Sequence, residues 1–261
     1  MAGTGPSARY PRARAAVAAL ALTVALFIGA GPAAGQEPPA CTIEGTPGAD
    51  FLFGTTEGDV ICGFEGPDTI FGLGGDDLLL GGPGADILLG GIGDDQLLGG
   101  PDADLLIGDA GNDRLLGTEG NDYLFGGADA DALGGGPGKD HIGGGEGGDS
   151  LDGGPGPDKL FGGPGNDSMG GGAGNDVMRG GGGNDWIDDA KGKDRFFGGP
   201  GNDSMYSSDG GGGDRLSGDA GKDCADIDDR VAGPDKAKRN IETLRIHPPA
   251  TRFCKNPTVD R

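Results

Sequence analysis

Aspartate recurs at a fixed spacing of nine residues through most of this 261-residue chain. The series has 18 members from Asp50 to Asp203, and it resumes at Asp214 after a slip of two residues. Carboxylates at a strict spacing can act as ligands for hard cations or, in pairs, as general acids and bases. The candidate residues are Asp50, Asp59, Asp68, Asp77, Asp86, Asp95, Asp104, Asp113, Asp122, Asp131, Asp140, Asp149, Asp158, Asp167, Asp176, Asp185, Asp194, Asp203, Asp214 and Asp223.

The residues around each aspartate repeat as well. Glycine stands two residues before the aspartate in 17 of 20 units and four residues after it in 17 of 20, and a large apolar residue stands two after it in 19 of 20. The unit therefore reads Gly-Gly-x-Gly-x-Asp-x-apolar-x. Its glycine-rich part can turn sharply, because glycine reaches positive φ without a Cβ clash. The three residues that follow predict a short strand with its apolar side chain pointing inward.

Two units make an 18-residue coil with two strands and two loops, so twenty units predict ten stacked coils. Parallel strands stack at about 4.7 to 4.9 Å, which makes the rod roughly 42 to 44 Å long. Each coil is too small to fold alone and gains its cohesion from its neighbours. The pattern therefore predicts an all-β solenoid over residues 46–227.

Stacking places the aspartates in two files, one through Asp50, Asp68 and Asp86 and the other through Asp59 and Asp77. Such carboxylates repel one another, and inward carbonyls of the glycine loops need a partner. Ca²⁺ satisfies both groups, because it takes about six to eight oxygen ligands. Mg²⁺ tends to keep its bound water. Zn²⁺ prefers Cys or His ligands, and the chain has only two histidines. Calcium is the metal that the pattern predicts.

The nonapeptide resembles that of RTX, or haemolysin-type, calcium-binding repeats, from Asp50 to about Ala225. The resemblance implies a parallel β-roll with Ca²⁺ between consecutive loops on the same side, held by the repeat aspartates and loop carbonyls. Nine intervals in each file set a ceiling of about 18 ions. Two departures predict fewer occupied sites. Thr46, Thr55, Phe64 and Leu73 replace the second glycine in the first four loops, and an insertion near Ser208 is expected to interrupt a file.

The charge balance supports the metal prediction. Residues 46–229 hold 37 acidic and 9 basic side chains, while only 34% of the whole chain is hydrophobic. Such a composition is typical of a disordered chain unless a bound cation supplies cohesion. We therefore expect folding and calcium binding to be one event. The acidic excess also argues against nucleic-acid partners, which need clustered basic residues.

Residues 1–35 have the composition of an export signal. Arg9, Arg12 and Arg14 precede an apolar stretch at residues 15–28, and small residues near 33–35 offer a cleavage point. The stretch is too short for an ordinary transmembrane helix, although an uncleaved anchor is the alternative. No second apolar run of membrane length follows. The mature product is predicted to be secreted, extracellular or on the cell surface, with residues 36–45 as an N-terminal cap.

The four cysteines lie near the two ends of the predicted rod. A disulfide requires Cα atoms within about 7 Å, so no bond can join the opposite ends. The predicted pairs are therefore Cys41 with Cys62 and Cys224 with Cys254. Free thiols in a reducing compartment would conflict with the export signal.

Residues 228–261 differ in composition from the repeats. Residues 230–261 hold eight bases and three acids, and residues 240–246 could add a final strand over the last coil. A basic C-terminal cap or tail whose charge complements the acidic rod is one interpretation. A separate anchor for an anionic cell surface is the other.

Outward positions of the first file are apolar over five coils. They are Phe51, Phe53, Phe71, Ile87, Leu89, Leu105, Ile107, Tyr123 and Phe125. A contiguous exposed patch of this kind is a candidate face for a protein or glycan partner. Alternatively, the repeats tolerate apolar residues there, or a capping segment covers them.

Catalytic motifs were not found in the sequence, since two histidines provide no triad and the paired carboxylates already serve as metal ligands. The chain is therefore predicted not to be an enzyme. The preferred function is calcium binding by an exported repeat protein that folds on Ca²⁺ as an extracellular scaffold or surface adhesion protein. The alternative is a calcium-dependent polysaccharide- or cell-wall-binding module. Ice binding is disfavoured, because regular threonine rows are absent from the loops.

Overall fold

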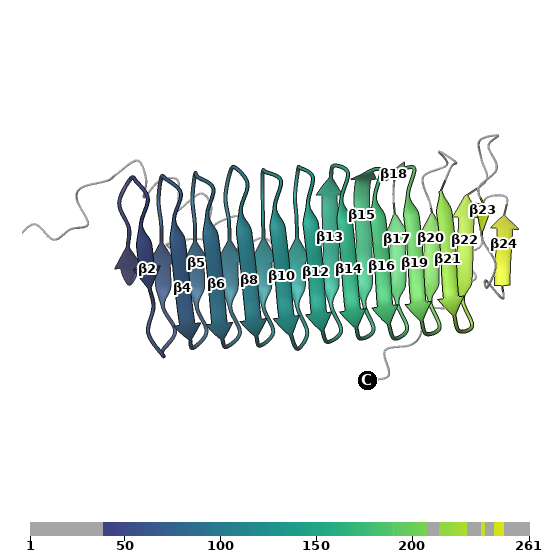
Figure 1. Ribbon diagram of the computed structural model, residues 1–261, viewed down its shortest axis with the longest axis horizontal. Coiled ribbons are helices and arrows are strands. Elements are labelled where there is room, and N and C mark those ends of the chain that lie inside the picture. Colours follow the sequence, from purple (N-terminus) through teal and green to yellow (C-terminus); the bar gives the residue numbers. More distant parts are fainter. Residues whose placement is uncertain (1–38, 190, 208–213, 229–235, 238–242, 248–261) are drawn as a thin grey trace, which may run out of the picture.

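The computed structural model describes residues 39–189, 191–207, 214–228, 236–237 and 243–247. Within these residues the chain winds as strands and loops around one straight axis (Figure 1). The strands form two parallel sheets, one of 13 strands and one of 11. No described helix has the length and hydropathy needed to cross a bilayer. The predicted all-β parallel solenoid is confirmed.

The two sheets are called sheet A and sheet B here. Sheet A contains β1 (Ile43–Glu44), β3 (Val60–Cys62), β5 (Leu78–Leu80), β7 (Gln96–Leu98), β9 (Arg114–Leu116), β11 (Ala132–Gly134), β13 (Ser150–Pro155), β15 (Ser168–Gly174), β17 (Trp186–Asp189), β18 (Lys191–Gly192), β20 (Ser204–Ser207), β22 (Cys224–Asp228) and β24 (Thr243–His247). Sheet B contains β2 (Phe51–Phe53), β4 (Thr69–Gly74), β6 (Ile87–Ile92), β8 (Leu105–Ala110), β10 (Tyr123–Ala128), β12 (His141–Glu146), β14 (Lys159–Pro164), β16 (Val177–Gly182), β19 (Arg195–Pro200), β21 (Arg215–Ala220) and β23 (Lys236–Ala237). Successive strands of the chain alternate between the two sheets along most of the rod.

Pairing within each sheet follows the 18-residue coil. Leu88 of β6 pairs with Leu106 of β8, and the same offset relates Leu79 of β5 to Leu97 of β7. The apolar residue two after each repeat aspartate therefore stacks on its counterpart and points between the sheets. From Ile61 to Leu216 these side chains are at most 2% exposed and form one continuous core. Burying each one stabilises the fold by about 1.5 to 3 kcal/mol, which no single coil could supply alone.

Many strands are longer than the three residues that the sequence predicted. β4 has six residues and β15 has seven, because pairing continues into the glycine-rich loop. Gly127 pairs with Gly145 in this way, and Ala128 pairs with Glu146. Equal loop lengths bring the backbone groups of neighbouring loops into register, so the loops themselves hydrogen-bond from coil to coil. The loops are therefore ordered parts of the ladder.

The ends of the rod carry further strands. β1 pairs with β3 beside the Cys41–Cys62 disulfide, whose Cα atoms are 6.0 Å apart, so this predicted pair is confirmed. At the other end β24 pairs with β22, which confirms the final strand expected near residues 240–246. Cys224 is also disulfide-bonded, but its predicted partner Cys254 lies outside the described residues. Residues 1–35, the predicted export signal, and most of the basic tail lie outside them too.

Candidate metal centre

Each repeat aspartate occupies the last loop position before a strand, and its carboxylate links two coils. The backbone N–H of Asp68 donates to Oδ1 of Asp86 at 2.7 Å, and that of Asp86 donates to Oδ1 of Asp104 at 2.8 Å. The residue after each aspartate completes the link, since Ile87 N–H donates to the carbonyl oxygen of Asp68 at 2.9 Å. From Asp68 onward, one carboxylate oxygen of each repeat aspartate is therefore fixed by the preceding coil. This fixed orientation aligns the two files along the rod.

The files continue across the two-residue insertion. Asp194 N–H donates to Oδ1 of Asp214 at 2.8 Å, and Asp203 N–H donates to Oδ1 of Asp223 at 3.0 Å, each across 20 residues instead of 18. The expectation that the insertion near Ser208 interrupts a file was therefore wrong. Strand pairing from β19 to β21 resumes in register, so the extra length does not alter the spacing of the ladder.

The second carboxylate oxygen has no such partner. From Asp68 to Asp185, and again at Asp203, Oδ2 of every repeat aspartate is buried and accepts no hydrogen bond from the residues that the structure describes. These side chains are at most 3% exposed. Burying a carboxylate oxygen without a donor is costly, and the same cost recurs at each unit. A periodic series of such oxygens is typical of cation ligands rather than of an isolated packing fault.

Carbonyl oxygens converge on the same places. An ideal Cβ on Gly72 would lie 2.2 Å from Oδ2 of Asp77 and 2.6 Å from the carbonyl oxygen of Gly90. Gly108 has the same surroundings, with Oδ2 of Asp113 at 2.2 Å and the carbonyl oxygen of Gly126 at 2.6 Å. A side chain at these positions would collide with both oxygens, which explains the glycine four residues after each aspartate. The local donors are oxygens alone, and they fit a hard cation such as Ca²⁺.

Burial changes the proton affinity of the buried aspartates. Desolvation raises the pKa of Asp104 to about 8 and that of Asp86 to about 7, although the backbone N–H bond to each carboxylate opposes the shift. Neighbouring carboxylates in the file raise these pKa values further. The same main cause raises the pKa of Asp122 to about 6. The metal-free array therefore favours protonation, whereas a bound cation would compete for the same oxygens.

The first two loops differ from the rest. Oδ2 of Asp50 accepts hydrogen bonds from the N–H (2.6 Å) and hydroxyl (2.9 Å) of Thr46. Oδ2 of Asp59 accepts the same pair from Thr55, at 2.8 and 2.9 Å. Burial acts to raise the pKa of Asp59, but hydrogen bonds from Thr55 and Thr42 outweigh it and lower the pKa. Both aspartates are half-buried, whereas the other 18 in the series are buried.

The sequence reasoning missed a second ladder and one acidic residue. The side chain one position before the repeat aspartate accepts a backbone N–H from the next coil, as Asn166 does from Asn184 at 2.7 Å and Asn184 from Asn202 at 2.9 Å. Recurrent Asn or Asp at this position was the available signal. Asp189, which stands where glycine is usual, lies near Asp176 and Asp194. The sequence shows that Asp189 departs from the repeat, but it does not show which way the side chain of Asp189 points.

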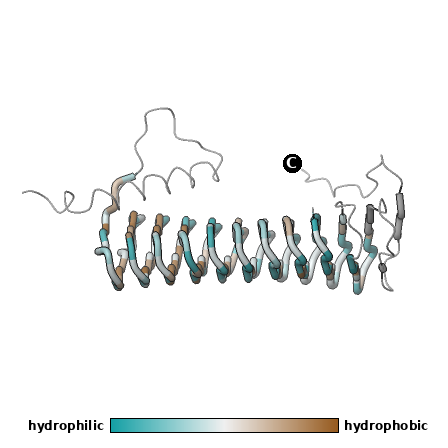
Figure 2. Tube along the Cα trace, turned by 90° about the horizontal axis from the view of Figure 1, so that it is seen from above, coloured by the Kyte–Doolittle hydropathy of each residue, from teal (hydrophilic) through white to brown (hydrophobic). Residues whose placement is uncertain are grey.

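The predicted apolar stripe lies on the outer face of sheet B. Phe51 and Tyr123 are 74% and 51% exposed, while Phe71 and Leu89 are half-buried. Phe53 and Phe71 stack with their ring centroids 5.0 Å apart. Hydrophobic colour is most frequent toward the N-terminal end of the rod, and hydrophilic colour increases toward the other end (Figure 2).

Aromatic and basic side chains continue this outer face. His141 stacks between Tyr123 and Phe161, with centroid distances of 5.4 and 6.2 Å. The guanidinium of Arg179 lies 5.3 Å from the ring centroid of Phe161 and 5.0 Å from that of Phe197. The outer face of sheet B therefore changes from apolar to aromatic and cationic along the rod.

Comparison with known families agrees with the geometry of the loops. The model of the RTX calcium-binding nonapeptide repeat (4 copies) matches residues 44–79, 63–97, 80–115, 107–142, 143–178, 170–205 and 179–212, which together cover residues 44–212. The chain belongs to this family. Calcium binding by the β-roll is thus supported by both the RTX repeats and their buried oxygen ladder. No curated protein matches the chain.

Proposed function

We propose that this RTX chain is an exported scaffold or surface adhesion protein whose β-roll folds when calcium binds between its loops. The observation that carries the proposal is the buried Oδ2, recurring from Asp68 to Asp185, to which none of the described residues donates a hydrogen bond. In the proposed state each ion draws on such an oxygen and on loop carbonyls like that of Gly90. Export is proposed from the composition of residues 1–35, and an extracellular setting agrees with the Cys41–Cys62 disulfide.

The proposed ligands are the repeat aspartates, although they are not equivalent. The repeat aspartates from Asp68 to Asp185 offer a buried oxygen that no described residue donates to, whereas Thr46 and Thr55 already donate to Asp50 and Asp59. We therefore assign these first two aspartates the weakest part in calcium binding. The number of ions is accordingly below the ceiling of about 18 set by the repeat count.

Equilibrium dialysis of the purified mature chain against Ca²⁺, together with far-ultraviolet circular dichroism, tests the proposal. The expected result is uptake of several ions per chain and a strand signal that appears over the same calcium range. A chain that keeps its full strand signal in excess chelator and takes up no calcium would overturn the proposal. A magnesium titration provides the control, because Mg²⁺ should not replace Ca²⁺ at equal concentration.

The outer face of sheet B favours a second candidate, a calcium-dependent polysaccharide- or cell-wall-binding module. Aromatic rings and an arginine on this face, such as the exposed Tyr123, the half-buried Phe161 and the exposed Arg179, suit a chain of sugar rings with acidic groups. The repeat spacing would present these groups along a straight line. Folding on calcium would make such binding depend on calcium.

A glycan array with and without calcium separates the two candidates. The module should bind acidic polysaccharides only with calcium, and Arg179→Ser should weaken that binding without changing calcium uptake. A pure scaffold should bind none.

The apolar end is tested by Phe71→Ser with Leu89→Ser, which should abolish any self-association or partner capture while calcium affinity is retained. An unchanged oligomeric state and unchanged capture would remove the apolar stripe from consideration.

A further inference from the structure

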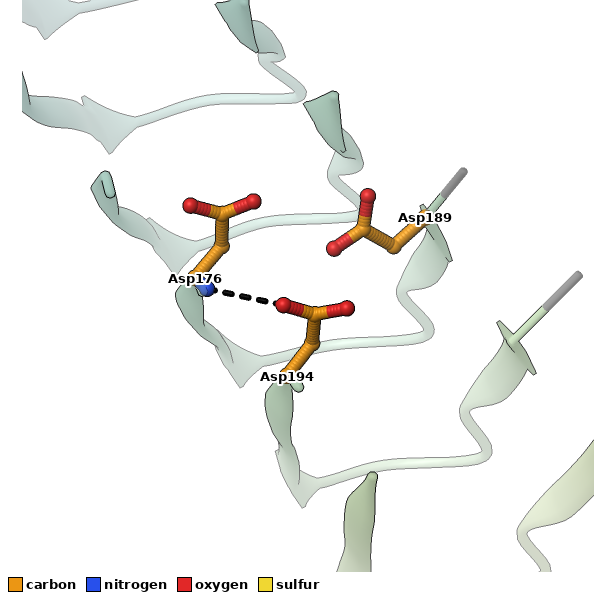
Figure 3. A group of neighbouring side chains, drawn as sticks. All are labelled: Asp176, Asp189 and Asp194. Carbon is orange, nitrogen blue, oxygen red and sulfur yellow. Dashed lines mark hydrogen bonds between the residues drawn. The ribbon is translucent and has the colours of Figure 1, made fainter. Parts of the chain in front are cut away.

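One interval of the roll contains an extra carboxylate. Asp189 is the last residue of β17 and stands where 17 of 20 units have glycine. Its side chain is 3% exposed and therefore points between the sheets. One carboxylate oxygen from each of Asp176, Asp189 and Asp194 lies within 4.8 Å of the others. Three acidic groups thus meet inside the rod, brought together from both sheets (Figure 3).

The geometry directs two of these oxygens at one place. An ideal Cβ on Gly171 would lie 2.7 Å from Oδ2 of Asp189 and 2.8 Å from Oδ2 of Asp176. Asp176 is fully buried, and its Oδ2 accepts no hydrogen bond from the described residues. Its backbone N–H donates to Oδ1 of Asp194 at 2.8 Å, which holds the third carboxylate against the first (Figure 3). The unpaired oxygen of Asp176 is therefore aimed into the cluster.

The spacing of the cluster suits one ion. Ca²⁺ binds oxygens at about 2.3 to 2.6 Å, so two oxygens that share an ion lie at most about 5 Å apart. The measured limit of 4.8 Å meets that condition for all three pairs of oxygens. Seventeen units place glycine where Asp189 stands and the other two place Ser207 and Ile227, so none of them has this third acidic side chain. More carboxylates in a rigid site increase its affinity for calcium.

We propose that Asp176, Asp189 and Asp194 form a three-carboxylate calcium site that fills before the other intervals of the roll. This inference rests on the proposed calcium binding and adds the order in which the sites fill, with this site first. The extra ligand is specific to this chain, because it replaces a repeat glycine. A first ion at this point would join the start of β16, the end of β17 and the start of β19, from which neighbouring coils could then order.

Terbium luminescence offers a local measurement of this site. The chain has one tryptophan, Trp186, three residues before Asp189 on the same strand. Tb³⁺ bound close to an excited tryptophan emits, so titration with Tb³⁺ reports ions near β17 separately from the total uptake. Competition with Ca²⁺ then gives the calcium affinity. The variants are Asp189→Asn, which removes one charge, and Asp189→Gly, which restores the repeat residue and should preserve the fold.

Both variants should lose the earliest step of terbium emission and bind their first calcium at least tenfold more weakly. Asp188→Asn is the matched control, because it removes the same charge from the outward neighbour and should leave that step unchanged. Superimposable titrations of the parent, Asp189→Asn and Asp189→Gly would overturn the inference. If dialysis still shows calcium uptake in that case, only the ranking fails. If no variant takes up calcium, the proposed function fails as well.

Discussion

In the first two loops of the roll, the carboxylate of the repeat aspartate has different hydrogen-bond partners from the equivalent carboxylate in the interior. In the first two, Thr46 and Thr55 donate both an N–H and a hydroxyl to the carboxylate of their own loop. In the interior the corresponding N–H, for example that of Gly82, donates instead to the next coil, and Oδ2 is left without a donor. The difference teaches that loop pairing and carboxylate satisfaction compete for one backbone group. Where coils pair fully, the carboxylate needs a cation.

Removing calcium should have the largest effect. In excess chelator at about pH 8 the interior coils should unfold, because most of the buried carboxylates then have neither a proton nor a cation. Hydrogen exchange would localise the loss, with residual protection expected near β1 and β3, where the disulfide and the threonine bonds remain. Uniform protection along the rod in chelator would contradict the contrast between the two regions.

Asp122→Asn and Asp59→Asn should separate the two kinds of loop. Asp122 has an unpaired Oδ2, so its replacement should reduce the number of calcium ions bound at saturation and cost about 2 kcal/mol of stability in calcium. The hydroxyl of Thr55 donates a hydrogen bond to Asp59, so replacing Asp59 should lower the free energy of unfolding by about 1 kcal/mol while the number of bound ions stays constant. Equilibrium dialysis with thermal unfolding measures both quantities. Equal ion counts in the two variants would argue against the assignment.

Acidification should partly replace calcium in the interior. The pKa of Asp104 rises to about 8 and that of Asp86 to about 7 in the folded state, against 3.8 for an ordinary aspartate. The metal-free fold therefore binds more protons than the unfolded chain, and its stability falls as pH rises from about 4 to about 8. Circular dichroism in chelator should show more strand at about pH 4.5 than at pH 8, while calcium affinity changes in the opposite direction. Asp59 has a lowered pKa, so its own contribution has the opposite sign and is lost as the pH falls.

Leu73→Gly should give a small gain in stability. Leu73 has a φ of 81° and is 50% exposed, so it bears the strain of a left-handed conformation and loses little by truncation. Glycine should raise the free energy of unfolding by about 1 kcal/mol in calcium. Thr118→Gly is the control, because Thr118 shares the conformation but its hydroxyl donates to Gly100 at 2.6 Å, so its gain should be smaller. Thermal unfolding compares the two variants.

The fold was predictable because one residue pattern decides register, core and loops at every coil. Leu88 and Leu106 are buried for the same reason, and the spacing alone places one above the other. The individual exceptions were not predictable. Thr55 and Thr118 occupy the same repeat position, yet only Thr118 has positive φ, so only Thr55 turns its N–H toward its own aspartate. The backbone conformation decides where the N–H points, and the residue type alone does not predict that conformation.

The candidate site was predictable only in part, because one of its residues departs from the repeat. The repeat aspartates were identified because they recur at one spacing in the sequence. Asp189 departs from the repeat, and whether its side chain reaches Asp176 depends on the space left above Gly171. The effect of the insertion near Ser208 was predicted from the number of residues alone. The aspartate file continues because the N–H of Asp194 still donates to the carboxylate of Asp214.

The link between aspartates has a direction. Each aspartate from Asp68 to Asp203 donates its backbone N–H to a carboxylate that comes later in the chain. A polypeptide emerges from the ribosome amino end first, so a given coil stays incomplete until the following one has been synthesised. The last segment made is therefore the one that finishes the array, and a truncated product would always end on an open edge.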